Sequence, residues 1–257
     1  MLRTIRRILH INRAAIAMAL CLMLVSGCMK KSTYHEKTTY PVFEPTEKYE
    51  TNITEVEETE AFYTEEADAF YKEDIPKEIR NKMWNVTISE SSVMSFSDLS
   101  YLTVTYMGYD DEKHEGHLIV DKNLADEVLS IFKELYEIGF PIEKMNLPDE
   151  YGGSDELSME DNNTSAFNDR PVAGTNTLSN HALGRAIDIN PLINPYVKYS
   201  TDTVLPKSGR EHLDRTLNEK GSITKDSECV EIFEKYGWTW GGNWKTLKDY
   251  QHFEKKS

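Results

Sequence analysis

The segment SNHALGRAIDIN, residues 179–190, combines a histidine, a glycine, an arginine and an aspartate within a short stretch. Its second half, AIDIN, alternates apolar and polar side chains, which predicts a short strand with both isoleucines facing a core. Asp188 then lies on the opposite face, where an unpaired buried carboxylate would be costly. Gly184 and Ala186 are small enough to leave room for a partner, and a metal ion shared with His181 would be such a partner.

A second stretch, YQHFE at residues 250–254, alternates in the same way and places His252 on a similar polar face. Two such strands side by side would bring His181, Asp188 and His252 together. Three nitrogen and oxygen ligands, with a fourth position left to water, form the arrangement of a catalytic zinc. Asp249 could then accept a proton from the water as general base. A hydrogen-bonded histidine–aspartate pair without a metal is the alternative that these residues leave open.

The first residues of the chain have the composition of an export signal. Four arginines precede an apolar run over residues 14–25, and no acidic residue occurs before Cys28. The run is too short for a membrane-spanning helix, which needs about 20 residues, but it suits a secretory signal over residues 1–27. LVSGC at residues 24–28 resembles the lipobox of bacterial lipoproteins, in which the cysteine is lipidated. An ordinary signal peptide with an incidental cysteine is the alternative.

Lipidation of Cys28 implies an exported protein anchored at the outer face of the bacterial cytoplasmic membrane, or at an outer membrane if one is present. Cys21 would leave with the signal, so only Cys229 would remain and no internal disulfide could form. Removing four of the 29 basic residues leaves 25 against 44 acidic residues, a net charge of −19. A chain this acidic is not expected to bind nucleic acid.

The segment that follows the cysteine, within residues 28–85, is rich in Thr, Glu, Tyr and Lys and has no sustained apolar period. Between Tyr49 and Phe70 it carries eight acidic residues and no basic residue. Such a segment repels itself and buries too little apolar surface to offset its ordering entropy, which predicts a disordered tether. Docking of its aromatic side chains on another surface is the alternative.

Residues 86–257 are expected to form one α+β domain. YLTVTY at residues 101–106 and HLIV at 117–120 are rich in β-branched and aromatic residues, and together they predict a hairpin. Apolar residues recur at helical spacing over residues 122–138, which predicts a helix on one face of the sheet. A second amphipathic helix is expected at residues 229–236. The expected fold is a small antiparallel sheet flanked by helices, with a zinc cleft.

The pattern S-x-H-x-x-G-x-A-x-D, over residues 179–188, resembles the signature of the zinc D-alanyl-D-alanine carboxypeptidases of VanY type. Relatives of that family are the VanX-type dipeptidases and the phage L-alanyl-D-glutamate endopeptidases. The second family element, an acid three residues before a histidine, is met by Asp249 and His252 in the expected order. The resemblance covers about residues 98–254.

The resemblance implies that His181, Asp188 and His252 bind zinc and that Asp249 activates the water. Glu254 shares a strand face with His252 and is the rival base, or else a residue that orients a ligand or a surface charge. VanX-type and many VanY-type enzymes carry glutamate where Asp249 stands, whereas the phage endopeptidases carry aspartate. The cleaved bond therefore stays open.

The same resemblance suggests residues that contact substrate. Arg170 matches the family position of an arginine near the substrate, where it could hold a carboxylate or an oxyanion; a structural salt bridge is the alternative. Ser179 is expected either to orient the substrate or to cap a turn. Trp240, with Trp238 and Trp244, is expected to wall the cleft or to lie in the core.

The expected function is that of a zinc-dependent peptidase acting on peptidoglycan stem peptides, with release of the terminal D-alanine as the first choice. One alternative keeps the chemistry and changes the bond, to that between L-alanine and D-glutamate or to a crosslink. Another is a wall-binding lipoprotein without catalysis. A membrane, through the lipid anchor, and the stem peptide are the expected partners.

Overall fold

The predicted hairpin forms the centre of a three-stranded antiparallel sheet in the computed structural model, which describes residues 68–172 and 175–256. β2 (Leu99–Met107) pairs with β3 (Lys113–Asp121), and β1 (Phe70–Glu73) pairs with the other edge of β2. Nearly every residue of β2 is buried. The hairpin prediction is confirmed.

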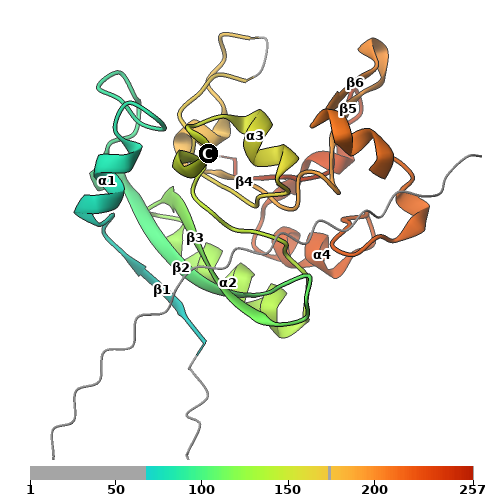
Figure 1. Ribbon diagram of the computed structural model, residues 1–257, viewed down its shortest axis with the longest axis horizontal. Helices are drawn as coiled ribbons and strands as arrows, with labels where there is room; N and C mark the ends of the chain where they lie inside the picture. Colours follow the sequence, from blue (N-terminus) through green and yellow to red (C-terminus); the bar gives the residue numbers. More distant parts are fainter. Residues whose placement is uncertain (1–67, 173–174, 257) are drawn as a thin grey trace, which may run out of the picture. The chain divides into compact units, whose positions relative to one another are not determined.

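The helix expected after the hairpin is also present, as α2 (Ala125–Glu137). It lies across one face of the β1–β2–β3 sheet (Figure 1). Its buried residues recur at helical spacing: Ala125, Val128, Ile131, Phe132 and Leu135. This apolar stripe is why the helix docks on the sheet.

The start of the domain differs from the expectation. Residues 70–85 were assigned to the tether, but β1 pairs with β2 and α1 (Lys77–Met83) follows it. Ile75 and Met83 are buried in a core cluster that also contains residues of β2 and β3. The apolar residues within residues 70–85 are too few and too scattered to show a helical or strand period. The residues that they contact lie far away in the sequence. The ordered domain therefore begins before β1. The signal, Cys28 and the tether up to residue 67 lie outside the described residues.

Two further small sheets complete the fold. One has the strand order β4–β9–β7 and the other the order β6–β5–β8, and all their pairings are antiparallel. The strands are β4 (Ala186–Asp188), β5 (Tyr196–Lys198), β6 (Thr203–Leu205), β7 (Thr239–Trp240), β8 (Lys248–Asp249) and β9 (His252–Glu254). The remaining α-helices are α3 (Asp155–Glu160) and α4 (Glu228–Lys235).

One face of the β4–β9–β7 sheet belongs to the main core. Ile187 of β4 and Phe253 of β9 are register partners and are fully buried. Phe253 stacks on Phe233 of α4, with ring centroids 3.9 Å apart. Since side chains alternate along a strand, the residues on either side of Ile187 and Phe253 are presented on the opposite face.

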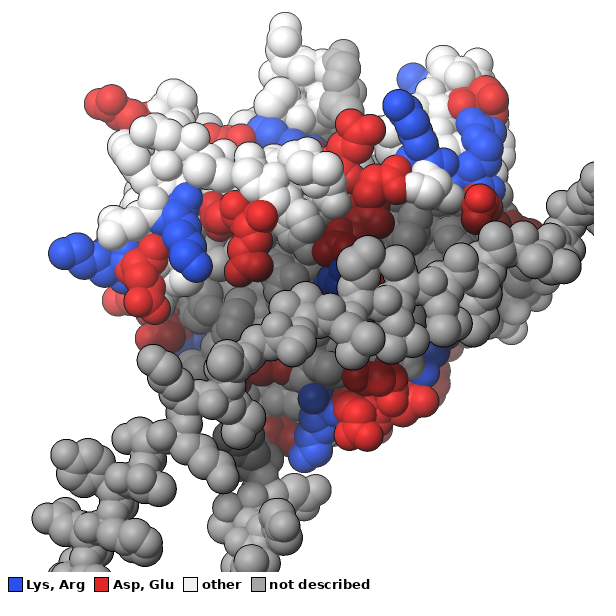
Figure 2. All heavy atoms as spheres, in the orientation of Figure 1, with Lys and Arg blue, Asp and Glu red and all other residues white. Residues whose placement is uncertain are grey.

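The charged surface and the lengths of the helices are the remaining general features of the fold. Figure 2 shows acidic and basic side chains interspersed over the face in view. Within the described ranges no helix is both long and apolar enough to cross a bilayer.

Candidate active site

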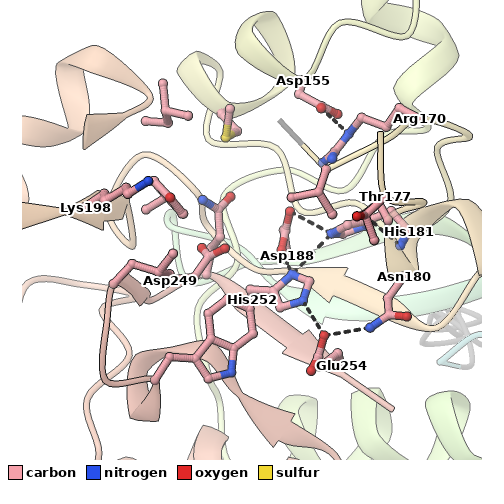
Figure 3. Close-up of a pocket in the computed structure, with 18 of the residues that line it drawn as sticks. Asp155, Arg170, Thr177, Asn180, His181, Asp188, Lys198, Asp249, His252 and Glu254 are labelled. Atoms are coloured by element: carbon pink, nitrogen blue, oxygen red, sulfur yellow. Dashed lines mark hydrogen bonds and ion pairs between the residues drawn. The ribbon is translucent and has the colours of Figure 1, made fainter. Parts of the chain in front are cut away.

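Three ligand-type side chains converge on the polar face of β4 and β9. Asp188 and His252 are direct register partners across the two strands. His181 comes from the short 3-10 helix Asn180–Leu183 that precedes β4. Asp188 lies 3.1 Å from Nε2 of His181 and 2.9 Å from Nδ1 of His252 (Figure 3). The two histidine nitrogens are 3.3 Å apart. The structure therefore brings together the three residues that the sequence singled out.

The hydrogen bonds behind the histidines leave the right nitrogens facing inward. Nδ1 of His181 donates to the carbonyl oxygen of Ala166 at 2.6 Å, so the lone pair of the neutral ring is on Nε2. Nε2 of His252 faces Glu254 at 3.4 Å, which leaves Nδ1 toward Asp188. Metal-bound histidines in proteins typically have such a partner on the second nitrogen.

The spacing of the three groups fits a metal ion. Their ligand atoms all lie within 4.8 Å of one another, and all three residues are largely buried. For an ion about 2.0–2.1 Å from each ligand, the edges of a coordination tetrahedron are about 3.3 Å long. The observed separations of 2.9–3.3 Å are close to this value. The group His181, Asp188 and His252 could therefore hold a metal, and its mixed nitrogen and oxygen donors suit zinc.

The pKa values of Asp188 and His252 show that the buried carboxylate needs a positive charge beside it. Burial disfavours the charged form of Asp188, but the two histidines outweigh burial and hold its pKa well below the ordinary range. Burial lowers the pKa of His252, whereas its hydrogen bonds to Asp188 and Glu254 raise it, with a net value of about 10. Without a metal, a proton on His252 supplies the cation that the buried carboxylate requires.

The segment before β4 owes its shape to two residues of the signature. Ser179 caps the 3-10 helix, since its Oγ accepts the backbone N–H of His181 at 3.2 Å. Gly184 ends that helix with a φ of +64°, and its carbonyl oxygen accepts the N–H of Asp121 at 2.9 Å. A Cβ on Gly184 would lie 2.4 Å from the Asp121 nitrogen. Gly184 thus allows the loop to dock on the end of β3. The expectation that it clears space over the metal is wrong.

Asp249 lies beside the metal-ligand group without being part of it. It is in β8, paired with Tyr196 of β5, and it lines the same cleft. Its Oδ1 is buried and has no hydrogen-bond partner among the residues described. Burial raises the pKa of Asp249 to about 6; the charge of Asp188 adds to this effect and His252 opposes it. A carboxylate with an unpartnered Oδ1 and a pKa near neutrality has the properties of a general base.

Glu254, the rival base, is engaged elsewhere. Its Oε2 accepts a hydrogen bond from Nδ2 of Asn180 at 2.7 Å and contacts His252. The bond to His252 is the main reason that the pKa of Glu254 lies below its ordinary value. These contacts favour a role for Glu254 in orienting His252, and they leave Asp249 as the better-placed base.

The site opens into a cleft of about 740 Å³. Arg170 lines this cleft and forms an ion pair with Asp155 (Figure 3). The arginine therefore makes the salt bridge considered as its alternative and still presents a cation to the cleft. Ser179 also lines the cleft, in addition to its capping role.

The structure separates two of the tryptophans that were considered for the cleft wall. Trp240 is only 2% exposed, belongs to the main core, and donates its indole N–H to the carbonyl of Tyr250 at 2.8 Å. Trp244 lines the cleft instead, with its ring centroid 5.4 Å from that of His252. The assignment of Trp240 to the cleft wall is wrong because its large apolar surface is used for packing.

The β6–β5–β8 sheet is the part of the site that sequence reasoning missed. It supplies Tyr196 and Lys198 to the cleft and positions Asp249 through the β5–β8 pairing. The pairing of β5 with β8 joins segments that lie far apart in the chain, and local sequence carries little signal for such a contact.

Comparison with known proteins agrees with this geometry. The family model described as D-alanyl-D-alanine carboxypeptidase matches residues 173–255, a range that contains His181, Asp188, Asp249 and His252. A search of curated proteins and a search of solved structures each give no match. Arg170 lies before the matched range. The match supports the D-alanyl-D-alanine carboxypeptidase family broadly, and with it a metallopeptidase.

Proposed function

We propose that this protein is a zinc-dependent peptidoglycan peptidase that removes the terminal D-alanine of stem peptides. The observation that carries the proposal is the buried group His181, Asp188 and His252 with the unpartnered carboxylate of Asp249 beside it in one cleft. The family match over residues 173–255 supports the same chemistry. A purely structural metal site would have no use for a buried carboxylate whose Oδ1 has no partner.

The roles of the side chains follow from their positions. A zinc ion bound by the three ligands supplies Lewis acidity toward the scissile carbonyl and lowers the pKa of water. Asp249, with a pKa of about 6, is largely ionised at neutral pH and can accept a proton from the attacking water. As the C–N bond breaks, Asp249 returns that proton to the leaving amine. Arg170 presents its guanidinium to a substrate carboxylate or to the developing oxyanion.

One alternative changes the bond that is cut. Asp249 stands where the phage endopeptidases carry aspartate, so cleavage between L-alanine and D-glutamate, or at a crosslink, is the alternative reaction. A wall-binding protein without catalysis is the remaining alternative, and the unpaired Asp249 argues against it.

We also propose the location of the reaction. Lipidation of Cys28 would hold the enzyme at the outer face of the bacterial cytoplasmic membrane, or at an outer membrane if one is present, where stem peptides are accessible. The acidic segment between Cys28 and β1 would then serve as a tether.

The test uses the full chain loaded with zinc, a stem pentapeptide, and mass spectrometry of the products with and without a chelator. Chelator-sensitive loss of one terminal alanine is the expected result. Cleavage after L-alanine would replace the carboxypeptidase by the endopeptidase. Binding of the peptide without any cleavage would leave only the wall-binding protein.

A further inference from the structure

A buried side chain next to a metal ligand has no role in the mechanism above. Gln251 is 2% exposed and lines the cleft. Its Oε1 is buried and accepts no hydrogen bond from any residue in the described ranges. Buried carbonyl oxygens are nearly always paired, and one left unpaired is costly. The free oxygen therefore points to a donor that arrives from outside the chain.

The orientation of the Gln251 amide is fixed by its neighbour. The Gln251 side chain lies close enough to Asp249 to lower the pKa of that carboxyl, an effect that the NH2 end of an amide produces. Oε1, at the other end of the amide, is the buried atom without a partner. The backbone is also fixed, because the carbonyl of Gln251 accepts the N–H of Ile189 at 3.0 Å. Oε1 is thus a preorganised acceptor beside the proposed base.

The carboxylates near the ligands contact other side chains or take part in the proposed reaction. The Oε2 atom of Glu254 is occupied by Asn180 and His252. Asp188 faces both histidines. Oδ1 of Asp249 is free, but the proposed reaction uses it for the proton of water. A neutral amide oxygen differs from these carboxylates because it binds an N–H donor without preferring a cation.

We propose that Oε1 of Gln251 accepts a hydrogen bond from a backbone amide N–H of the bound peptide and so positions the peptide next to Asp249. The ligand class is a peptide with a secondary amide at this position; a tertiary amide, which lacks the N–H, is excluded. The inference rests on the proposed peptidase function and adds a residue that selects and positions its substrate.

The test compares the full, zinc-loaded protein with Gln251→Met, which keeps the volume and removes the acceptor. Each is assayed on a stem pentapeptide and on versions N-methylated at one non-scissile amide at a time. In the wild type, methylation at one amide is expected to raise KM about tenfold, the factor for one net hydrogen bond. Gln251→Met should raise KM for the unmodified peptide by a similar factor and should abolish the extra penalty at that amide. Because methionine also removes the amide NH2 beside Asp249, kcat is expected to change as well, and the N-methyl penalty is the readout that identifies the contact.

Gln251→Glu is the matched control, because it restores an acceptor oxygen at the same place. The penalty for N-methylation should return in this variant, whatever its absolute rate. If the penalty at every amide is the same in Gln251→Met as in the wild type, the methyl group acts only by its bulk and the inference is overturned. Zinc content and urea unfolding of each variant show whether the fold is retained.

Failure of the proposed function gives a different result. If the wild type does not cleave the pentapeptide, calorimetric titration gives the binding constants of the unmodified and N-methylated peptides for the wild type and for Gln251→Met. The N-methyl penalty is then compared between the two proteins as a loss of binding affinity. Loss of the N-methyl penalty in Gln251→Met would then support the contact although the protein is no peptidase. Equal penalties in both proteins would overturn it.

Discussion

Replacing Asp249 with asparagine should remove most of the turnover and at the same time stabilise the metal-free protein. The substitution keeps the size of the side chain and removes its ability to accept a proton. A general base contributes a factor of about 10² to 10⁴, which is about 3 to 5 kcal/mol of activation free energy. Asp249 is outside the group of metal ligands, so zinc content should stay at the wild-type level.

The stability change follows from the buried carboxyl. A pKa raised from 3.8 to about 6 means that ionisation of Asp249 opposes folding, by about 3 kcal/mol once the pH is above the folded-state value. Asparagine does not ionise. Asp249→Asn should therefore have the higher free energy of unfolding at pH 7, and the difference should fade as the pH falls toward 4. In the wild type, kcat/KM should fall on the acid side with a midpoint no higher than about pH 6, since a bound cation would lower this pKa further.

The assays are release of D-alanine by mass spectrometry, zinc stoichiometry, and urea unfolding of the metal-free protein at pH 4 and pH 7. The matched control is Asp226→Asn, because the side chain of Asp226 is 86% exposed and lies outside the cleft. It should match the wild type in all three assays. An Asp249→Asn protein that keeps more than about a tenth of the activity would refute the assignment of the base. One that is less stable than the wild type at pH 7 would refute the account of the buried charge.

The metal group and the start of the domain give further predictions. His252, with a pKa of about 10, must lose a proton to bind a metal, so the apparent zinc affinity should rise about tenfold per pH unit below that value; calorimetry in buffers of different ionisation enthalpy measures the released proton. Glu254→Gln should lower zinc affinity about 10- to 100-fold, because His252 loses a charged partner, and competition with a chelator measures this. A protein that starts at residue 86 lacks the buried side chains of Ile75 and Met83. Its free energy of unfolding should be lower by about 4 kcal/mol or more than that of a protein that starts at residue 68. Equal urea midpoints for the two proteins would contradict the revised domain start.

The parts of the fold that could be predicted are those whose information is local. Strands β2 and β3 have long runs of β-branched and aromatic residues, and α2 has an apolar stripe. Alternation also placed Asp188 and His252 on one face, because the side-chain period of a strand needs only a few residues. Their direct pairing in the β4–β9 register is what the structure adds.

The parts that could not be predicted depend on contacts between distant segments. The ordering of β1 comes from its pairing with β2, because two aromatic residues in a four-residue strand are a weak signal on their own. The function of Gly184 depends on the end of β3, which lies more than sixty residues earlier and approaches the Gly184 backbone closely. Trp240 and Trp244 are the same residue type in the same short segment. Only their packing shows that Trp240 lies in the core and Trp244 in the cleft.

The positions of the ligands along the chain have a mechanical consequence. His181 and His252 are 71 residues apart, so an ion held by both would close a loop that contains β5, β6 and α4. By loop-closure entropy alone, a crosslink of that length is worth about 4 kcal/mol. Unlike a disulfide, this metal crosslink would not be broken by reductants, but a chelator would remove it. When zinc is withdrawn, the backbone amides of the residues between His181 and His252 should exchange their hydrogens faster, while the amides of β2 and β3 remain protected.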